Sequence, residues 1–224
     1  MTRCRTGPAS VHARLRVAIL GLALTQVLVG VACTQPAAAP TGLPPGVFPG
    51  APDIRLAPAG RYALDPNHAS VIARVSHLGY SRSVFRFNGV KGDLAWDPAS
   101  VSRSSLTATI QTDSVATNVP GFAAEIAGEP FLKSKAFPQA TFVSTAFRPA
   151  GAAHGKVDGQ FTLMGRTRPL TFDVALVGAG KGFGGHPRLG VEAHAWINPA
   201  DFGLPPMMAD PIELVIDTEF EKAS

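Results

Sequence analysis

The residues best suited to chemistry in this 224-residue chain are histidines near its first strand-like segment. His68 follows Asp65 by three residues and precedes Ser70 by two, which puts an acid, a base and a hydroxyl in one short stretch. Triads are defined by three-dimensional geometry, so three residues of one turn are poorly placed for a proton relay. Hydrogen bonding within the turn explains them better. We predict no catalytic residue here.

His77 is the more informative histidine, because a period of two places it on the same strand face as Val75 and Ala73. A neutral imidazole that faces the interior can hydrogen-bond the polar end of a ligand. The alternative is a core histidine whose hydrogen bonds are satisfied by a neighbour. Neither the histidines nor the cysteines show the tight spacing of metal ligands, so we expect no metal site.

Phenylalanine dominates the aromatic residues, with 13 Phe against 2 Trp and 2 Tyr. Ligand cavities are lined mainly by apolar and aromatic groups. We expect a cavity with Phe85, Phe87, Phe142, Phe161 and Phe172 on its wall, Phe122, Phe131 and Phe137 as a lid, and Phe202 near an end. The same rings can also form an ordinary core, because a small barrel either fills with side chains or holds one small ligand.

A β-hairpin over residues 156–176 is the clearest element that positions these rings. Phe161 alternates with polar residues in its first arm, and Phe172 lies on the apolar face of its second arm. Gly165 can adopt the positive φ of a tight turn. Pro169 has no N–H for a ladder, so we place it first in the return strand.

Six further segments show the two-residue alternation of half-buried strands or belong to the same pattern. They cover residues 71–77, 85–89, 106–111, 141–147, 189–197 and 212–220, with the hairpin supplying two arms. Residues 119–138 break the rhythm, and we expect short helical segments that cover one end. About eight strands joined by short turns predict an all-β fold, an antiparallel barrel or sandwich closed at its edges.

The first part of the chain differs in composition. Residues 1–32 carry four arginines and no acid before an apolar run, which is typical of a signal peptide. Residues 33–59 are rich in Pro and Ala and predict a tether, and the domain covers residues 60–224. Four of the 20 basic residues lie in the leader, so the remainder balances the 16 acids and does not indicate nucleic-acid binding.

The end of the apolar run, Leu28-Val-Gly-Val-Ala-Cys33, resembles a bacterial lipoprotein signal. The resemblance implies lipidation at Cys33, export to the periplasm and anchoring to the outer membrane. The alternative is a leader cleaved near residues 37–39, with Cys33 discarded.

The motifs of the domain, taken in order, resemble the YceI-like family of bacterial envelope proteins. They are Tyr62-x-Leu-Asp65-x-x-His68-x-Ser70, Val75-Ser-His77-Leu-Gly79-Tyr-Ser81, Phe85-x-Phe87-x-Gly89, Asp113-Ser-Val-Ala-Thr117-Asn118, Phe131-Leu132, Phe137-Pro138, Thr141-Phe-Val-Ser-Thr145, Gly159-Gln-Phe-Thr-Leu-Met-Gly165 and Asp201-Phe-Gly203. The resemblance implies a lipocalin-like antiparallel barrel whose apolar interior holds a polyisoprenoid, such as a quinone tail, and no other cofactor.

Two departures from the family pattern concern polar groups. The family often has Arg-Asp-x-His-Leu where this chain has Gly121-Phe-Ala-Ala-Glu-Ile126, and an Arg shortly before Asp201 where this chain has Asn198-Pro-Ala200. If these segments lie at the mouth, a different headgroup, or none, is recognised.

The leading hypothesis is therefore an exported, lipid-anchored, non-catalytic protein that holds an isoprenoid or other long-chain lipid for transport, storage or envelope stress protection. The alternatives are an enzyme acting on such a lipid with His77 as acid or base, and a filled-core module that binds a partner. A homodimer is one assembly compatible with the sequence.

Overall fold

The structure is a computed structural model that describes residues 42–44 and 46–223. The predicted signal peptide, residues 1–32, the proposed lipidation site Cys33 and the first part of the predicted tether lie outside the described residues. None of the described helices is both long and apolar enough to cross a bilayer.

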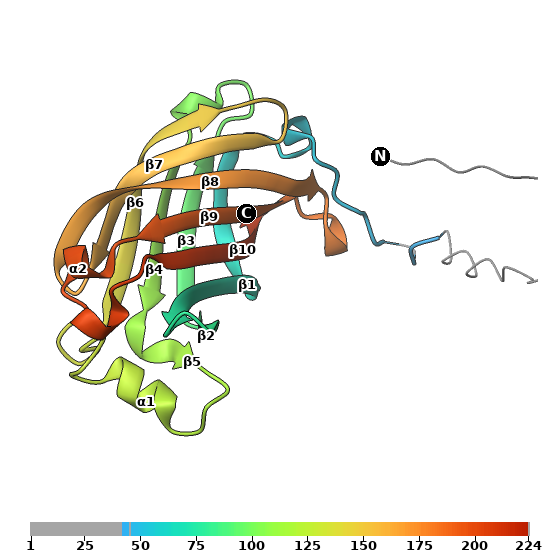
Figure 1. Cartoon of the computed structure of the whole chain (residues 1–224). Helices are drawn as coiled ribbons and strands as arrows, with labels where there is room; N and C mark the ends of the chain where they lie inside the picture. The colour runs from blue at the N-terminus through green and yellow to red at the C-terminus, as the bar shows by residue number, and fades with distance from the viewer. Residues whose placement is uncertain (1–41, 45, 224) are drawn as a thin grey trace, which may run out of the picture. The chain divides into compact units, whose positions relative to one another are not determined.

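All the strands of the described chain belong to one antiparallel sheet, coloured along the chain in Figure 1. They are β1 (Gly60–His77), β2 (Ser81–Phe87), β3 (Val90–Trp96), β4 (Ser105–Gln111), β5 (Val115–Ala116), β6 (Gln139–Pro149), β7 (His154–Leu163), β8 (Arg166–Gly180), β9 (Arg188–Ile197) and β10 (Ile212–Lys222). The 3-10 turn η1 (Ile54–Leu56) precedes β1. Short helices between the strands are α1 (Phe122–Ala127), α2 (Pro199–Phe202), and the 3-10 turns η2 (Val101–Arg103), η3 (Thr112–Ser114), η4 (Phe183–Gly185) and η5 (Pro206–Met208).

The sheet closes on itself because β10 pairs with β1. β2 and β3 both pair with β1 and are separated by two residues, so they continue one another, as do β4 and β5 along their neighbours. The result is a closed barrel of eight sides in which successive strands are neighbours. This confirms the predicted barrel, and α1 confirms the predicted helical segments between residues 119 and 138.

β1 changes face halfway along its length. Leu64 pairs with Phe220, but Ala69 pairs with Thr218, so residues 65–68 form a bulge. The extra residues reverse the alternation, and Leu64 and Val71 therefore both face the interior despite their odd spacing. The sequence pattern predicted only the half of this strand that follows the bulge.

An ion-pair cluster on the outer face holds this bulge. The carboxylate of Asp65 accepts hydrogen bonds from the backbone N–H of Asn67 at 3.0 Å and from Arg188 at 2.7 Å, and it lies 2.8 Å from Nδ1 of His68. His68, and then Arg188, hold the pKa of Asp65 far below its usual value, while Asp65 raises the pKa of His68. The predicted local turn bonding of Asp65 and His68 is therefore present, on the outside of the barrel.

The β7–β8 hairpin turns at Met164 and Gly165, which both have positive φ (51° and 72°), the geometry of a two-residue type I′ turn. β8 therefore begins at Arg166, and the expectation that Pro169 opens the strand is wrong. Pro169 lies opposite Gln160. Hydrogen-bonded and non-hydrogen-bonded pairs alternate from Leu163 and Arg166, which close the hairpin, so the pair of Pro169 and Gln160 is a non-hydrogen-bonded one. An N–H at residue 169 would point toward β9, but β9 pairs with β8 only from Asp173 onward. Proline therefore costs the sheet no hydrogen bond at this position.

Residues 50–58, which we call the strap, pack on the barrel although they belong to the predicted tether. Ala51 exchanges backbone hydrogen bonds with Ala179 of β8 at 3.0 and 2.8 Å, and Ala57 is fully buried. The Ala57 carbonyl accepts a hydrogen bond from Trp96 Nε1 at 3.1 Å. The strap end of the barrel is where β1 begins, and the lid end, with α1, is where β1 finishes (Figure 1).

Candidate functional site

The barrel encloses a cavity of about 270 Å³ bordered by side chains of every strand except the short β5. Inward-facing aliphatic side chains around its middle remain only half-buried. They are Leu64, Leu106, Val174, Leu176, Val191, Leu214 and Ile216. An inward side chain keeps accessible area only when the space in front of it is unfilled, so the middle of the barrel is hollow.

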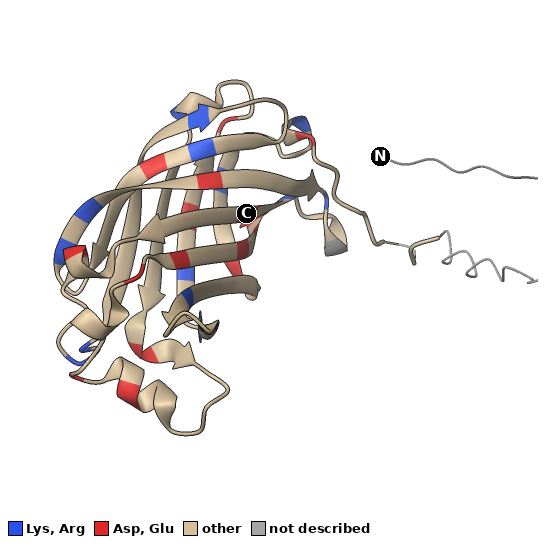
Figure 2. Cartoon of the chain, viewed as in Figure 1, with Lys and Arg blue, Asp and Glu red and all other residues tan. Residues whose placement is uncertain are grey.

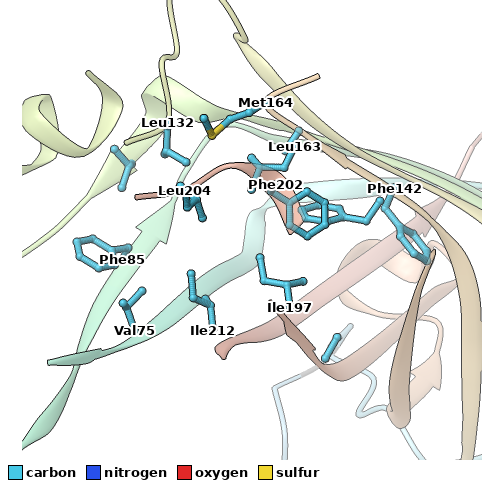
Figure 3. Packing of buried hydrophobic residues seen from close by; sticks show 14 of the residues in the cluster. Val75, Phe85, Leu132, Phe142, Leu163, Met164, Ile197, Phe202, Leu204 and Ile212 are labelled. Atoms are coloured by element: carbon cyan, nitrogen blue, oxygen red, sulfur yellow. The ribbon is translucent and has the colours of Figure 1, made fainter. Parts of the chain in front are cut away.

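Packed apolar clusters close the cavity toward both ends. At the lid end, Figure 3 shows Val75 and Phe85 from β1 and β2 gathered with Ile212 from β10 and with Leu132 and Leu204 from connecting segments. At the strap end a smaller cluster contains Ala57, Tyr62, Leu94, Ala179, Leu189 and Phe220. Burial there raises the pKa of Tyr62 to about 12, and its Oη donates a hydrogen bond to the Pro58 carbonyl at 2.7 Å.

The polar groups inside the cavity are few. Thr112 is almost fully buried, and its Oγ1 donates to the Phe137 carbonyl at 2.7 Å. Thr218 on β10 has only a long contact, 3.5 Å, to the Glu219 carbonyl. Its hydroxyl is therefore the interior polar group best able to hydrogen-bond a bound molecule.

Charged residues border the cavity only near the β6–β7 turn, and they are engaged on the outer face. Arg148 donates two hydrogen bonds of 2.6 Å to Asp158, whose pKa it lowers to about 2. Lys156 is paired with Asp173. The bore itself is consequently uncharged, and it suits an apolar molecule better than an ionic one.

Six of the predicted phenylalanines line the cavity: Phe85, Phe87, Phe131, Phe142, Phe161 and Phe172. Phe142 and Phe172 meet edge to face on the wall, with ring centroids 5.1 Å apart and planes at 89°. A Cβ on Gly159 would lie 2.4 Å from the Phe142 ring and 2.6 Å from the Val143 carbonyl oxygen, so this ring position requires glycine on β7.

The other three predicted phenylalanines form a second layer behind this wall. Phe122 of α1 packs on Phe85 at 5.8 Å, and Phe202 of α2 packs on Phe161 at 5.4 Å. Phe137 is half-buried and lies against the turn at Gly165. These rings support lining residues but do not themselves border the cavity.

His77 does not face the cavity as its alternation predicted. It is the last residue of β1, three residues beyond the last pair with β10, Arg74 and Glu213. At this point only β2 accompanies the strand, which projects past the barrel wall, and the His77 side chain is exposed. β1 continues beyond the barrel interior, so His77 does not border the cavity.

The main residues that sequence reasoning missed are aliphatic, together with the whole of β3. Val90, Leu94 and Trp96 of this strand line the cavity. The two-residue alternation of Val90-Lys-Gly-Asp-Leu-Ala-Trp96 was the available signal, but Gly92 leaves a gap in its apolar face.

Asp65, His68 and Glu219 bring three potential metal ligands within 4.8 Å of one another. Arg188 donates to Asp65 at 2.7 Å and to Glu219 at 2.8 Å, so a guanidinium already supplies positive charge to both carboxylates. The donor set does not fit a further cation.

Comparison with known proteins agrees with this geometry. Residues 62–220 match the YceI-like domain family. A UPF0312 protein of Pseudomonas putida strain W619 is 35% identical over 165 residues, which cover 72% of this chain and 86% of that protein.

Solved structures share the fold. Burkholderia cenocepacia BcnA has a TM-score of 0.63 at 23% identity, covering 70% of this chain and 98% of that one. A polyisoprenoid binding domain from Saccharophagus degradans, implicated in plant cell wall breakdown, has a TM-score of 0.53 at 14% identity, covering 72% and 98%.

Proposed function

This chain belongs to the YceI-like family, and on that premise we propose that its barrel binds the hydrocarbon chain of a long apolar lipid, specifically an isoprenoid such as a quinone tail or a polyprenol. The observation that carries the proposal is the hollow between the two packed clusters, with aliphatic side chains half-exposed toward it. The polyisoprenoid binding domain of Saccharophagus degradans supports the choice of ligand through its shared fold.

The energetics need no catalytic group. Removing apolar surface from water is favourable by about 25 cal/mol per Å², so every 100 Å² of buried tail contributes about 2.5 kcal/mol. Binding alone therefore accounts for the cavity, and we propose that the protein acts as a carrier or store. The exposed position of His77 gives no support to the hypothesis of acid–base catalysis inside the barrel, and the hollow argues against the filled-core module.

The two tryptophans allow a direct test, because Trp96 borders the cavity while Trp196 is exposed on the outer face of β9. A long-chain quinone titrated into the Trp196→Phe variant should quench the remaining Trp96 with a saturable, one-to-one profile. The matched Trp96→Phe variant, which retains only Trp196, should be quenched much less. Equal quenching of both variants would place the quinone outside the bore.

Native mass spectrometry then identifies the natural ligand and its stoichiometry. The purified full chain should carry an extractable isoprenoid, and the same spectrum reports whether a homodimer forms. A ligand-free mass that persists after incubation with quinones and polyprenols would contradict the proposal.

We also propose, from the sequence of the leader, that the protein is exported to the periplasm and anchored to the outer membrane by lipidation of Cys33. Metabolic labelling with a fatty acid tests this. Label should be incorporated into the wild type and into Cys4→Ala, and lost from Cys33→Ala. Retention of label by Cys33→Ala would contradict lipidation at this residue.

A further inference from the structure

The lid end of the barrel exposes large apolar side chains on separate turns. Tyr80 and Leu78, in the β1–β2 turn, are 87% and 81% exposed, and Met207 of η5 is 78% exposed. Val119, in the segment before α1, is half-exposed. Figure 1 shows the β1–β2 turn, α1 and the segment between β9 and β10 at the same end.

Leu78 is unfavourable for the stability of the folded monomer in two ways. It has a positive φ of 53° and precedes Gly79 at 77°, a backbone conformation that favours Gly, Asn or Asp over leucine. Its side chain is also left in water. Leucine at this position stabilises neither the turn nor the core of the monomer. Its presence therefore points to an interaction with another molecule.

These side chains continue the apolar lining of the bore to the surface. Exposed Met207 adjoins Met208, which borders the cavity, and Leu78 follows three residues after Val75, which also borders it. Between these turns, the cavity is covered by side chains of connecting segments, among them Leu132. A molecule leaving the bore at this end would meet exposed apolar side chains on more than one turn.

The charges near the lid balance. Glu125 lies within α1, and Glu129, Lys133 and Lys135 follow the helix closely. Positive and negative charges therefore occur on the same segment (Figure 2). The surface lacks the excess of one charge that would select a polyelectrolyte. Its partner is selected by apolar contact.

The strap end differs from the lid end. Near the strap, Phe48 and Leu56 are about half covered, at 46% and 47% exposure, and Val177 of β8 is 64% exposed. The ammonium of Lys181 also lies 5.9 Å from the Phe48 ring centroid.

We propose that the lid end docks on the surface of a lipid bilayer, with Leu78, Tyr80 and Met207 entering the interface between headgroups and acyl chains. The inference rests on the proposed function, because it assigns the place where the bound lipid enters and leaves. Tyrosine suits this depth, since its ring is apolar and its hydroxyl stays wet. A few inserted side chains give a weak, reversible contact that suits a carrier. Because the charges balance, docking needs no anionic lipid.

Site-specific fluorescence tests the orientation. In the full chain with both native cysteines replaced by alanine, a bimane label is placed by Leu78→Cys, Tyr80→Cys or Met207→Cys. Val143→Cys and Val177→Cys, at exposed apolar positions on the barrel wall and at the β8 bulge near the strap, are the matched controls. Each protein is mixed with phosphatidylcholine vesicles, with and without lipids that carry a nitroxide quencher in the acyl chain.

Labels at the three lid-end positions should shift to shorter wavelength and be quenched by the nitroxide, and labels at the two control positions should not. Adding phosphatidylglycerol should change this little. The readout is local to each label, so membrane attachment through residues 1–41 cannot imitate it. Quenching at Val177→Cys alone, at every position or at none would overturn the proposal.

Transfer kinetics separate this inference from the proposed function. The double variant Leu78→Ser, Tyr80→Ser should take up a polyprenol from vesicles at least about tenfold more slowly, as expected when two apolar side chains are lost from the contact. The double variant Val143→Ser, Val177→Ser should transfer at the wild-type rate. Polyprenol delivered in detergent should bind both equally. If the wild type does not bind polyprenol delivered in detergent, the proposed function is refuted. If the two double variants take up polyprenol from vesicles at the same rate, only the docking surface is refuted.

Discussion

Replacing Ala108 by Phe should close the bore to a lipid tail without weakening the fold. Ala108 lies on β4, borders the cavity and is only half-buried although it faces inward. At about 10–15 Å³ per water-sized group, the 270 Å³ cavity accommodates about 20 such groups, so a phenyl ring fits.

The expected loss of affinity follows from the area that the ring takes from the tail. A buried phenylalanine covers about 150–250 Å², and about 100 Å² of that would otherwise contact the ligand. At about 25 cal/mol per Å² the loss is about 2.5 kcal/mol, or about 50- to 100-fold in Kd. Ala63→Phe places the same ring on the exposed outer face of β1 and should leave Kd unchanged.

The sign of the stability change tests the hollow itself. In a filled core, an added ring costs about 1–3 kcal/mol through overpacking. That cost corresponds to a decrease in Tm of about 2–4 °C per kcal/mol for a domain of this size. In a hollow barrel the ring buries itself in unfilled space, so Tm without ligand should stay level or rise. Quinone titration and thermal denaturation of both variants measure the two effects. A lower Tm with unchanged Kd would refute the existence of the hollow.

Three further predictions concern the wall, the bulge and the lid. Gly159→Ala should lower the free energy of unfolding by about 1–3 kcal/mol because its Cβ would meet the Phe142 ring and a backbone carbonyl, as urea denaturation would detect; a neutral effect would mean that the ring moves freely. Because the folded pKa of Asp65 is lowered, its stabilisation is complete above its unfolded pKa of about 4 and is lost as the pH falls through the folded value. Wild-type stability should therefore decline more steeply than that of Asp65→Asn below pH of about 4, and parallel profiles would contradict the assignment. Phe131→Ala should speed ligand release in stopped-flow exchange, since it removes a buried ring that covers the cavity, and an unchanged rate would exclude this route.

The two-residue alternation predicted most of the barrel, because most of its strands bury one face and expose the other. It failed where the backbone departs from regular pairing. The bulge at residues 65–68 reverses the inward face, so no single alternation spans β1. The alternation did not predict β3, because Gly92 interrupts its apolar face. A Cβ added at Gly92 would lie 3.3 Å from Leu64.

The cavity was less predictable than the fold. Phenylalanines such as Phe142 line the cavity, since large apolar residues on an alternating face point inward. Alternation gives direction but not depth, so it could not show that His77 lies beyond the interior, nor that Phe202 lies behind Phe161. Whether the inside is filled depends on the barrel radius, which pairing register sets and local sequence does not encode.

Closure of the sheet by its first and last strands has a consequence for folding of the chain. Tyr62 pairs with Lys222, and the N–H of Ala223 donates to the carbonyl of Arg61 at 2.9 Å, so the final contacts join nearly opposite ends of the domain. Such high contact order slows folding, because the whole intervening loop must be ordered before the pairing is gained. Until β10 pairs with β1, one side of β1 remains an unpaired edge beside an apolar concave surface. The unclosed sheet is therefore the most aggregation-prone intermediate in the folding of this protein.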